Sequence, residues 1–282
     1  MKLNLSCTDF SFPLLDHDRA LAVIGLLGLS GVDIGLFEGH GHLKPSKELL
    51  KPARNGTALK RRLVAQGLKA ADIFLQIHAG FVEFAINHPE VKRRKFARDQ
   101  FERALDYAHA AGSAHITLLP GVSFAGESRE TSVSRSADEL AWRVGRAQSA
   151  KLQLAVEPHV GSLIATPERA LDLARRVPGL GVTLDYAHFT RAGIPDARIE
   201  PLTQFATHLH ARTARRGRLQ SSLKDNTIGF PRALSALWKR KFTGWIALEY
   251  VWIDWEHCNE VDVVSESIQM KKLLETAAAK IK

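Results

Sequence analysis

The sequence contains two cysteines, Cys7 and Cys258, among its 282 residues. Two cysteines cannot build a disulfide framework, and this pair lacks the CxxC spacing of a zinc site. We therefore expect reduced thiols in an intracellular protein. Cys258 stands in the segment EYVWIDWEHCNE, where a buried structural cysteine is a better interpretation than a functional one.

Long apolar runs are also missing. A membrane-spanning helix needs roughly 18–20 consecutive apolar residues, and no stretch of this sequence reaches that length. The first residues, MKLNLSCTDF, pass from one lysine directly into strand-like alternation, without the apolar core of a signal peptide. We expect a cytoplasmic protein with no membrane partner.

No glycine-rich phosphate loop of the GxGxxG or GxxxxGKS/T type follows a strand-like segment, so no nucleotide cofactor is indicated. Acidic residues are outnumbered, 30 against 39 lysines and arginines, which gives a net charge of +9. Such an excess favours anionic partners. Much of it lies in helix-like stretches such as residues 91–108, where basic residues form a solvated face. We therefore expect a small anionic or polar metabolite rather than nucleic acid as the partner.

Short apolar segments alternate with longer amphipathic ones along the whole chain. The strand-like segments are residues 3–10, 31–37, 72–80, 114–121, 152–159, 181–189, 205–212 and 245–251. The segments with a 3.6-residue period are 18–30, 57–71, 95–112, 136–151, 166–177, 196–204 (weak), 230–241 and 263–282. Thr166 and Pro167 supply an N-cap and a first helical residue for one of them.

This alternation predicts an α/β fold: a single (β/α)8 TIM barrel domain over residues 1–282. A doubly wound open sheet is the alternative. Eight repeats in a chain of this length favour closure.

Four of the later strand-like segments end on residues that can bind metal. They supply Glu157, Asp185, His210 and Glu249. The carboxyl ends of the strands of such a barrel converge on one face, so these residues are predicted to meet there. Three carboxylates in one pocket repel each other strongly, and a divalent cation resolves that conflict. Oxygen-rich ligation with one imidazole suits Mn²⁺ first, with Mg²⁺, Co²⁺ or Zn²⁺ as alternatives.

Several neighbouring residues are candidates for substrate binding. His208 shares a strand face with His210 but lies deeper, where we expect a hydrogen bond. His188 lies just past its strand and is well placed for a substrate oxygen. For His78 a structural hydrogen bond and a catalytic role are equally good interpretations. Four arginines follow strand seven and favour an anion-binding role for at least one of them: Arg212, Arg215, Arg216 and Arg218.

The ordered segments AVEPHVGSLIATPERALDLA, LGVTLDYAHFTRAG, HLHAR and GWIALEY resemble the strand-end motifs of one family over nearly the whole chain. This is the sugar phosphate isomerase/epimerase family, with the xylose isomerase-like TIM barrel of the endonuclease IV superfamily. The resemblance implies that Glu157, Asp185, His210 and Glu249 bind one divalent metal, and that Glu157 and Glu249 also transfer protons. It also implies that His188 and Arg216 touch substrate oxygens.

The chain departs from related patterns in two places. The segment EPHVGSLIA lacks the second acidic residue of the ketose 3-epimerases, and this leaves the substrate open. Endonuclease IV needs further histidines where this chain has ITLLPG and SSLKDNTIG, although His78 resembles its strand-three ligand.

We therefore expect a metal-dependent isomerase or epimerase that acts on a sugar, a sugar phosphate or a related hydroxy-ketone through an enediolate. The alternatives are an endonuclease IV-like phosphodiesterase on abasic DNA and a dehydratase acting on a cyclic keto acid such as 3-dehydroshikimate. The expected partner is a small carbohydrate or hydroxy-keto acid. A homodimer is compatible with the sequence, which does not fix the oligomeric state or the native metal.

Overall fold

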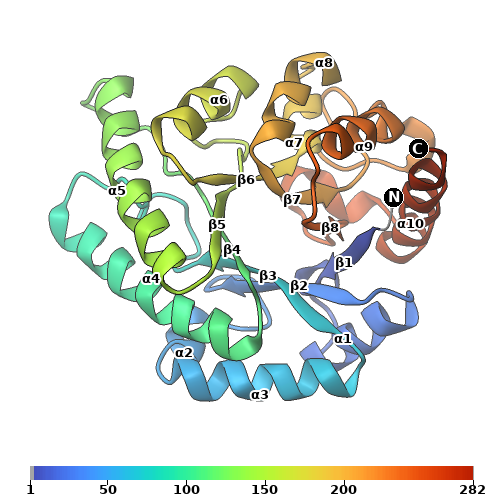
Figure 1. Ribbon diagram of the computed structural model, residues 1–282, viewed down its shortest axis with the longest axis horizontal. Helices are drawn as coiled ribbons and strands as arrows, with labels where there is room; N and C mark the ends of the chain where they lie inside the picture. Colours follow the sequence, from blue (N-terminus) through green and yellow to red (C-terminus); the bar gives the residue numbers. More distant parts are fainter. Residues whose placement is uncertain (1–2, 282) are drawn as a thin grey trace.

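A computed structural model describes residues 3–281 and shows a closed barrel of eight parallel strands (Figure 1). Met1, Lys2 and Lys282, which the predicted domain includes, lie outside the described residues. The strands are β1 (Asn4–Thr8), β2 (Gly31–Phe37), β3 (Lys69–Gln76), β4 (His115–Leu118), β5 (Gln153–Val156), β6 (Gly181–Asp185), β7 (Ala206–Ala211) and β8 (Trp245–Leu248). Because β1 pairs with both β2 and β8, the sheet has no free edge. The predicted TIM barrel is confirmed.

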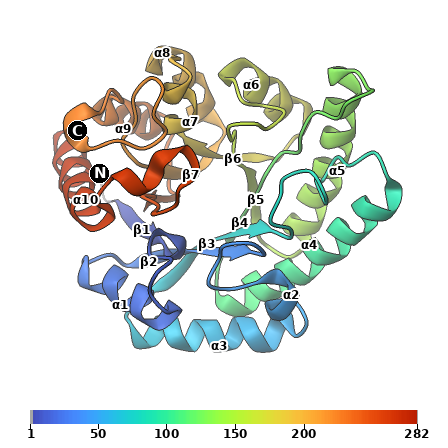
Figure 2. The same ribbon diagram turned by 180° about the vertical axis from the view of Figure 1, so that it is seen from behind.

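Helices surround the barrel on all sides (Figures 1 and 2). The α-helices are α1 (His17–Leu26), α2 (Pro45–Glu48), α3 (Pro52–Ala65), α4 (Val91–Ala111), α5 (Arg129–Ser149), α6 (Pro167–Arg176), α7 (Tyr186–Arg191), α8 (Asp196–Ile199), α9 (Phe230–Lys239) and α10 (Val263–Lys280). Short 3₁₀ segments are η1 (Asp9–Ser11), η2 (Glu200–Gln204), η3 (Leu223–Asp225) and η4 (Trp255–Glu260). Within residues 3–281, no helix is long and apolar enough to cross a membrane.

Two boundaries differ from the sequence prediction in ways that matter for the site. Strand β6 stops at Asp185 rather than continuing to residue 189, because the Asp185 carboxylate accepts a hydrogen bond from Ala187 N and starts α7 at once. Strand β3 starts at Lys69 and ends at Gln76, so His78 lies beyond the strand in a loop. The predicted helix start at Thr166 is confirmed, since its side chain accepts from Arg169 N.

The interior of the barrel is polar. Asp33 on β2 lies 2.6 Å from His208 on β7, and since these strands are not neighbours, the contact crosses the barrel interior. A second crossing contact joins Thr117 on β4 to Thr183 on β6 at 2.7 Å. Barrel interiors are usually filled by branched apolar side chains. Here hydrogen-bonded polar side chains fill part of that space, and the apolar core lies mainly between the strands and the helices.

Helices α3 and α4 approach closely at Gly56. A Cβ atom at this position would lie 2.9 Å from Ala110 Cβ and even closer to the carbonyl oxygen of Tyr107. Any side chain at position 56 therefore forces the two helices apart.

We predict that Gly56→Ala lowers the free energy of unfolding by roughly 1–3 kcal/mol, because overpacking shifts a well-packed helix pair. The matched control is Gly145→Ala in α5, where an added Cβ meets nothing within 4 Å. That change should stabilise the protein by about 0.5–1 kcal/mol through helix propensity. Urea denaturation of both variants measures the difference. Equal effects at the two positions would contradict the close approach.

Candidate active site

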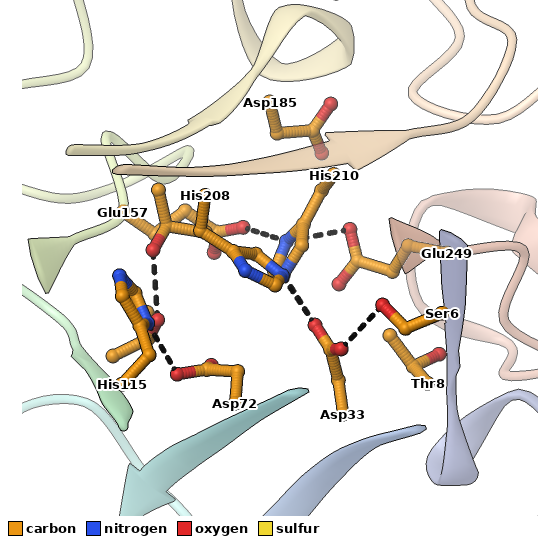
Figure 3. Close-up of polar contacts among 12 residues, drawn as sticks. Ser6, Thr8, Asp33, Asp72, His115, Glu157, Asp185, His208, His210 and Glu249 are labelled. Carbon is orange, nitrogen blue, oxygen red and sulfur yellow. Dashed lines mark hydrogen bonds and ion pairs between the residues drawn. The ribbon is translucent and has the colours of Figure 1, made fainter. Parts of the chain in front are cut away.

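Side chains from four strand ends meet at the carboxyl-terminal mouth of the barrel (Figure 3). Glu157 follows β5, Asp185 ends β6, His210 lies near the end of β7, and Glu249 follows β8. All four residues are at most 4% exposed. His210 Nδ1 lies 2.8 Å from Glu157 Oε1 and 3.1 Å from Glu249 Oε2. One buried imidazole thus joins two of the three predicted carboxylates.

Asp185 is held by a different partner, Arg212. The Nε and Nη2 atoms of Arg212 donate to Asp185 Oδ2 over 3.0 and 2.6 Å. The same Nη2 lies 3.4 Å from Glu249 Oε2 and 3.1 Å from His188 Nε2. Arg212 is 3% exposed. The fourth predicted metal ligand is therefore paired with a buried guanidinium.

Burial and neighbouring charges give the two glutamates different pKa values. Burial raises the pKa of Glu157 to about 7, although the hydrogen bond from His210 opposes the rise. Burial acts on Glu249 in the same direction, but Arg212 and His210 outweigh it and lower the pKa of Glu249 to about 2. Burial opposes the charged form of His210, yet Glu249 and the neighbouring acids raise its pKa well above the ordinary value. One carboxylate can thus change its protonation state near neutral pH while the other stays ionised.

Three donors fit a divalent cation. One ligand atom each from Glu157, His210 and Glu249 lies within 4.8 Å of the others. Glu249 Oε2 and His210 Nε2 are buried and make no hydrogen bond within residues 3–281. Two carboxylates and an imidazole are a donor set that divalent metals accept, and catalytic sites often use three protein ligands.

Two histidines, His159 and His188, border this cluster. Each can also offer a ligand atom beside Glu157. His188 Nε2 lies 3.8 Å from Glu157 Oε2, and the two imidazole rings are 4.2 Å apart between centroids. His159 also stacks on Trp255 at 5.3 Å with an angle of 13° between the planes. Both histidines therefore belong to the wall of the site.

Asp33 supports the site from inside the barrel. Its Oδ1 accepts from Ser6 Oγ at 2.7 Å, and its Oδ2 lies 2.6 Å from His208 Nε2 and 3.6 Å from His210 Nε2. Burial alone would raise the pKa of Asp33, but the two histidines hold it well below its usual range. At 3.6 Å Asp33 is too far from His210 Nε2 for a hydrogen bond, but its negative charge beside the ring favours the protonated imidazole. The deeper position and hydrogen bond expected for His208 are confirmed.

A cavity of about 440 Å³ opens above these groups. Its polar lining includes Glu157, Glu249, Arg212 and His159. The rest is largely apolar, with rings from Phe10, Phe37, Phe74, Phe81 and Trp255. The cavity lining therefore combines aromatic side chains with charged groups.

A model of the xylose isomerase-like TIM barrel family matches residues 24–274. The chain belongs to this family. Among curated proteins, no sequence matches the chain.

Solved structures of similar proteins cover almost the whole xylose isomerase-like barrel. The D-psicose 3-epimerase of Clostridium cellulolyticum H10, solved with D-tagatose, is 14% identical over 98% of this chain and 99% of its own, with a TM-score of 0.76. The IOLI protein with a bound zinc atom is 16% identical, covers 99% of each chain and has a TM-score of 0.69. A family 2 AP endonuclease of Brucella melitensis is 17% identical over the full length of both chains, with a TM-score of 0.67. At these identities the similarity shows the fold.

Two predicted substrate-binding residues of this xylose isomerase-like barrel lie away from the central cavity. His78 is half-buried, accepts from Gly80 N at 3.1 Å through Nδ1 and lines a smaller adjoining cavity of about 70 Å³. Arg216 is exposed on the loop after β7 and packs near Gly193. Within the described residues, Arg212 is the arginine that lines the central cavity.

Sequence reasoning missed two residues of the site. Asp33 is a charge inside the otherwise uncharged strand GVDIGLF, and that pattern could have identified it. His159 stands two residues after Glu157, a spacing that can place both side chains in one pocket.

The pH dependence of stability tests the buried state of His159. Burial lowers the pKa of His159 to about 4, whereas a histidine in an unfolded chain titrates near about 6.5. Between these values the unfolded chain binds a proton that the folded chain does not, so stability rises with pH. One such proton contributes a slope of about 1.4 kcal/mol per pH unit.

We predict that His159→Gln flattens this slope by about one proton between roughly pH 4 and 6.5, in urea denaturation of EDTA-treated protein. His109→Gln, at an exposed position of α4, is the control and should not flatten it. An unchanged slope in His159→Gln would show that this histidine is charged or solvated in the folded protein.

Proposed function

We propose that the chain is an isomerase or epimerase that enolises a hydroxy-ketone, such as a sugar, a sugar phosphate or a related compound. The observation that carries the proposal is the pair Glu157 and Glu249, which line one cavity and flank the same imidazole. Their pKa values lie far apart, at about 7 and about 2. Two titratable groups with separated pKa values in one cavity are typical of an acid and base pair.

In the proposed reaction one glutamate takes a proton from the carbon beside the carbonyl, and the other returns one. Return to the opposite face of the same carbon gives epimerisation, whereas return to the neighbouring carbon gives isomerisation. Glu249, ionised over a wide pH range, suits the role of base. Glu157 can hold or release a proton near neutral pH and suits the role of its partner.

We propose one divalent cation, held by Glu157, His210 and Glu249, with Mn²⁺ ahead of Mg²⁺, Co²⁺ and Zn²⁺. Asp185 is the fourth ligand that the sequence predicts. When bound, such an ion polarises a carbonyl and its adjacent hydroxyl and stabilises the negative charge of an enediolate. The zinc atom of the similar IOLI structure supports metal binding by a protein of this fold.

The proposed substrate is a small carbohydrate or hydroxy-keto acid. The cavity volume of about 440 Å³ lies in the range of roughly 300–1,000 Å³ that is usual for small-molecule sites. Aromatic rings can pack against the C–H faces of such a molecule while its oxygens meet the charged groups. The D-tagatose in the similar D-psicose 3-epimerase structure supports this class. We also propose a cytoplasmic location, where the buried free thiols of Cys7 and Cys258 would stay reduced.

A dehydratase acting on a cyclic keto acid is the second candidate. Arg212 favours it, because a buried guanidinium lining the cavity can pair with a substrate carboxylate. We rank an endonuclease IV-like activity lower. The residues after β4 are Leu119 and Pro120, where that enzyme needs a further histidine ligand.

We predict solvent deuterium incorporation at a carbon of the true substrate when ketoses, their phosphates and 3-dehydroshikimate are incubated with the protein and Mn²⁺ in deuterated water. Glu157→Gln and Glu249→Gln should each slow this exchange about 10²–10⁴-fold, because each removes a proton-transfer group. NMR spectroscopy follows the exchange.

The matched control for these variants is Glu102→Gln, a surface glutamate paired with Arg146, which should leave exchange unchanged. Full exchange in both site variants would contradict the proposed proton transfer. Metal-dependent incision of an abasic duplex, lost in Asp185→Asn, would instead promote the endonuclease.

A second pair of variants separates metal binding from substrate binding. We predict that His188→Ala keeps the metal but lowers kcat roughly 10²–10³-fold, as loss of one donor to a developing oxyanion does. His210→Ala should lose both metal and turnover, since His210 lies between the two glutamates. Metal stoichiometry and initial rate measure both effects. A metal-free His188→Ala would make that histidine a ligand, and full activity would make it structural.

A further inference from the structure

Arg212 occupies an unusual position for an arginine. It directly follows β7 and lies two residues after His210, so the two side chains share the strand face directed toward the site. It lines the central cavity although it is 3% exposed. Its other loop neighbours Arg215 and Arg216 are exposed. A buried guanidinium requires anionic partners, and Asp185 supplies the closest one.

One guanidinium nitrogen is surrounded by groups that could otherwise bind a metal. Arg212 Nη2 lies 2.6 Å from Asp185 Oδ2, 3.4 Å from Glu249 Oε2 and 3.1 Å from His188 Nε2. A divalent cation bound by both Asp185 and Glu249 would have to lie between the same oxygens. The guanidinium and a four-ligand metal therefore compete for one position.

We propose that Arg212 is a resident cation of this site, which neutralises Asp185 and lowers the affinity of the remaining three donors for divalent metal. The inference rests on the metal site of the proposed function. Two physical effects support it. The Arg212 bonds withdraw one carboxylate from ligation, and a fixed positive charge within a few ångströms repels a divalent ion in a buried environment.

The arrangement has a consequence for the substrate. A site built from four anionic or imidazole ligands leaves the stabilisation of a developing oxyanion to the metal. Here Arg212 lines the cavity together with Glu157 and Glu249. Its guanidinium can donate to an anionic substrate oxygen whatever metal is present. In this proposal Arg212 supplies part of the positive charge that a metal would otherwise supply to the substrate oxygen.

Metal affinity tests the proposal without depending on turnover. EDTA-treated full-length protein is titrated with MnCl₂, and separately with ZnCl₂, by isothermal calorimetry. Arg212→Met and Arg212→Gln should bind metal at least tenfold more tightly than the unaltered chain. Arg212→Lys keeps the charge and should stay within about threefold of it. Arg215→Gln removes an exposed positive charge from the same loop and should also stay within about threefold.

A double-mutant cycle identifies the carboxylate involved. If Arg212 holds Asp185 out of the metal site, adding Asp185→Asn abolishes the gain in Arg212→Met, so the double variant binds metal no more tightly than Asp185→Asn alone. Arg212→Gln takes the place of Arg212→Met in this cycle if Arg212→Met does not fold, which circular dichroism reports.

Three results would overturn the inference: equal or weaker binding in the Arg212→Met and Arg212→Gln variants, no binding in any variant, or a gain in Arg212→Met that persists when Asp185→Asn is added. Failure of the proposed function has a different signature. In that case no ketose or keto acid exchanges deuterium, while the calorimetric differences between the variants persist.

Discussion

The burial of three carboxylates at one end of the barrel is the constraint on which this site depends. Isolated carboxylates are costly to remove from water, and a group of them is costlier because they repel one another. Two side chains from the end of β7 balance these negative charges. His210 lies between Glu157 and Glu249, and Arg212 pairs with Asp185. Both cationic groups stand on or directly after β7. The charge balance of the site is therefore largely set by two residues of one strand end.

The placement of these two cationic side chains also gives the two glutamates different pKa values. Glu249 lies near both Arg212 and His210, and its pKa falls to about 2. Glu157 has His210 as its hydrogen-bonding partner, and burial raises its pKa to about 7. The same residue type thus acquires two chemical characters within one cavity, from the placement of neighbouring charges rather than from sequence. This asymmetry is what an enolising enzyme needs in a proton-transfer pair.

Much of the fold followed from the sequence because a βα repeat is a local pattern. Apolar segments and helical periods can be recognised along the chain, and strand ends in a barrel point to one face. The convergence of Glu157, His210 and Glu249 follows from that rule. The partner of Asp185 could not be predicted, because it depends on which side chain reaches across the mouth. Arg212 and Arg216 look alike in the sequence, yet one is buried in the site and the other is exposed. Asp33 was missed because its contact with His208 crosses the barrel between strands that are not neighbours. The metal-ligand role of the predicted residues remains a prediction.

The polar barrel interior has a consequence for how such a site can change. Ser6, Asp33 and His208 come from three different strands, and each satisfies a buried polar group of another. Replacing one leaves its partners unsatisfied, so the effects of substitutions at these positions cannot be additive. In related barrels, the residues equivalent to Ser6, Asp33 and His208 should therefore be substituted together rather than one at a time. A designer who grafts the strand-end residues onto a barrel with an apolar interior would also have to carry over the layer beneath them, or the grafted histidine would lose the negative charge of Asp33 beside its ring.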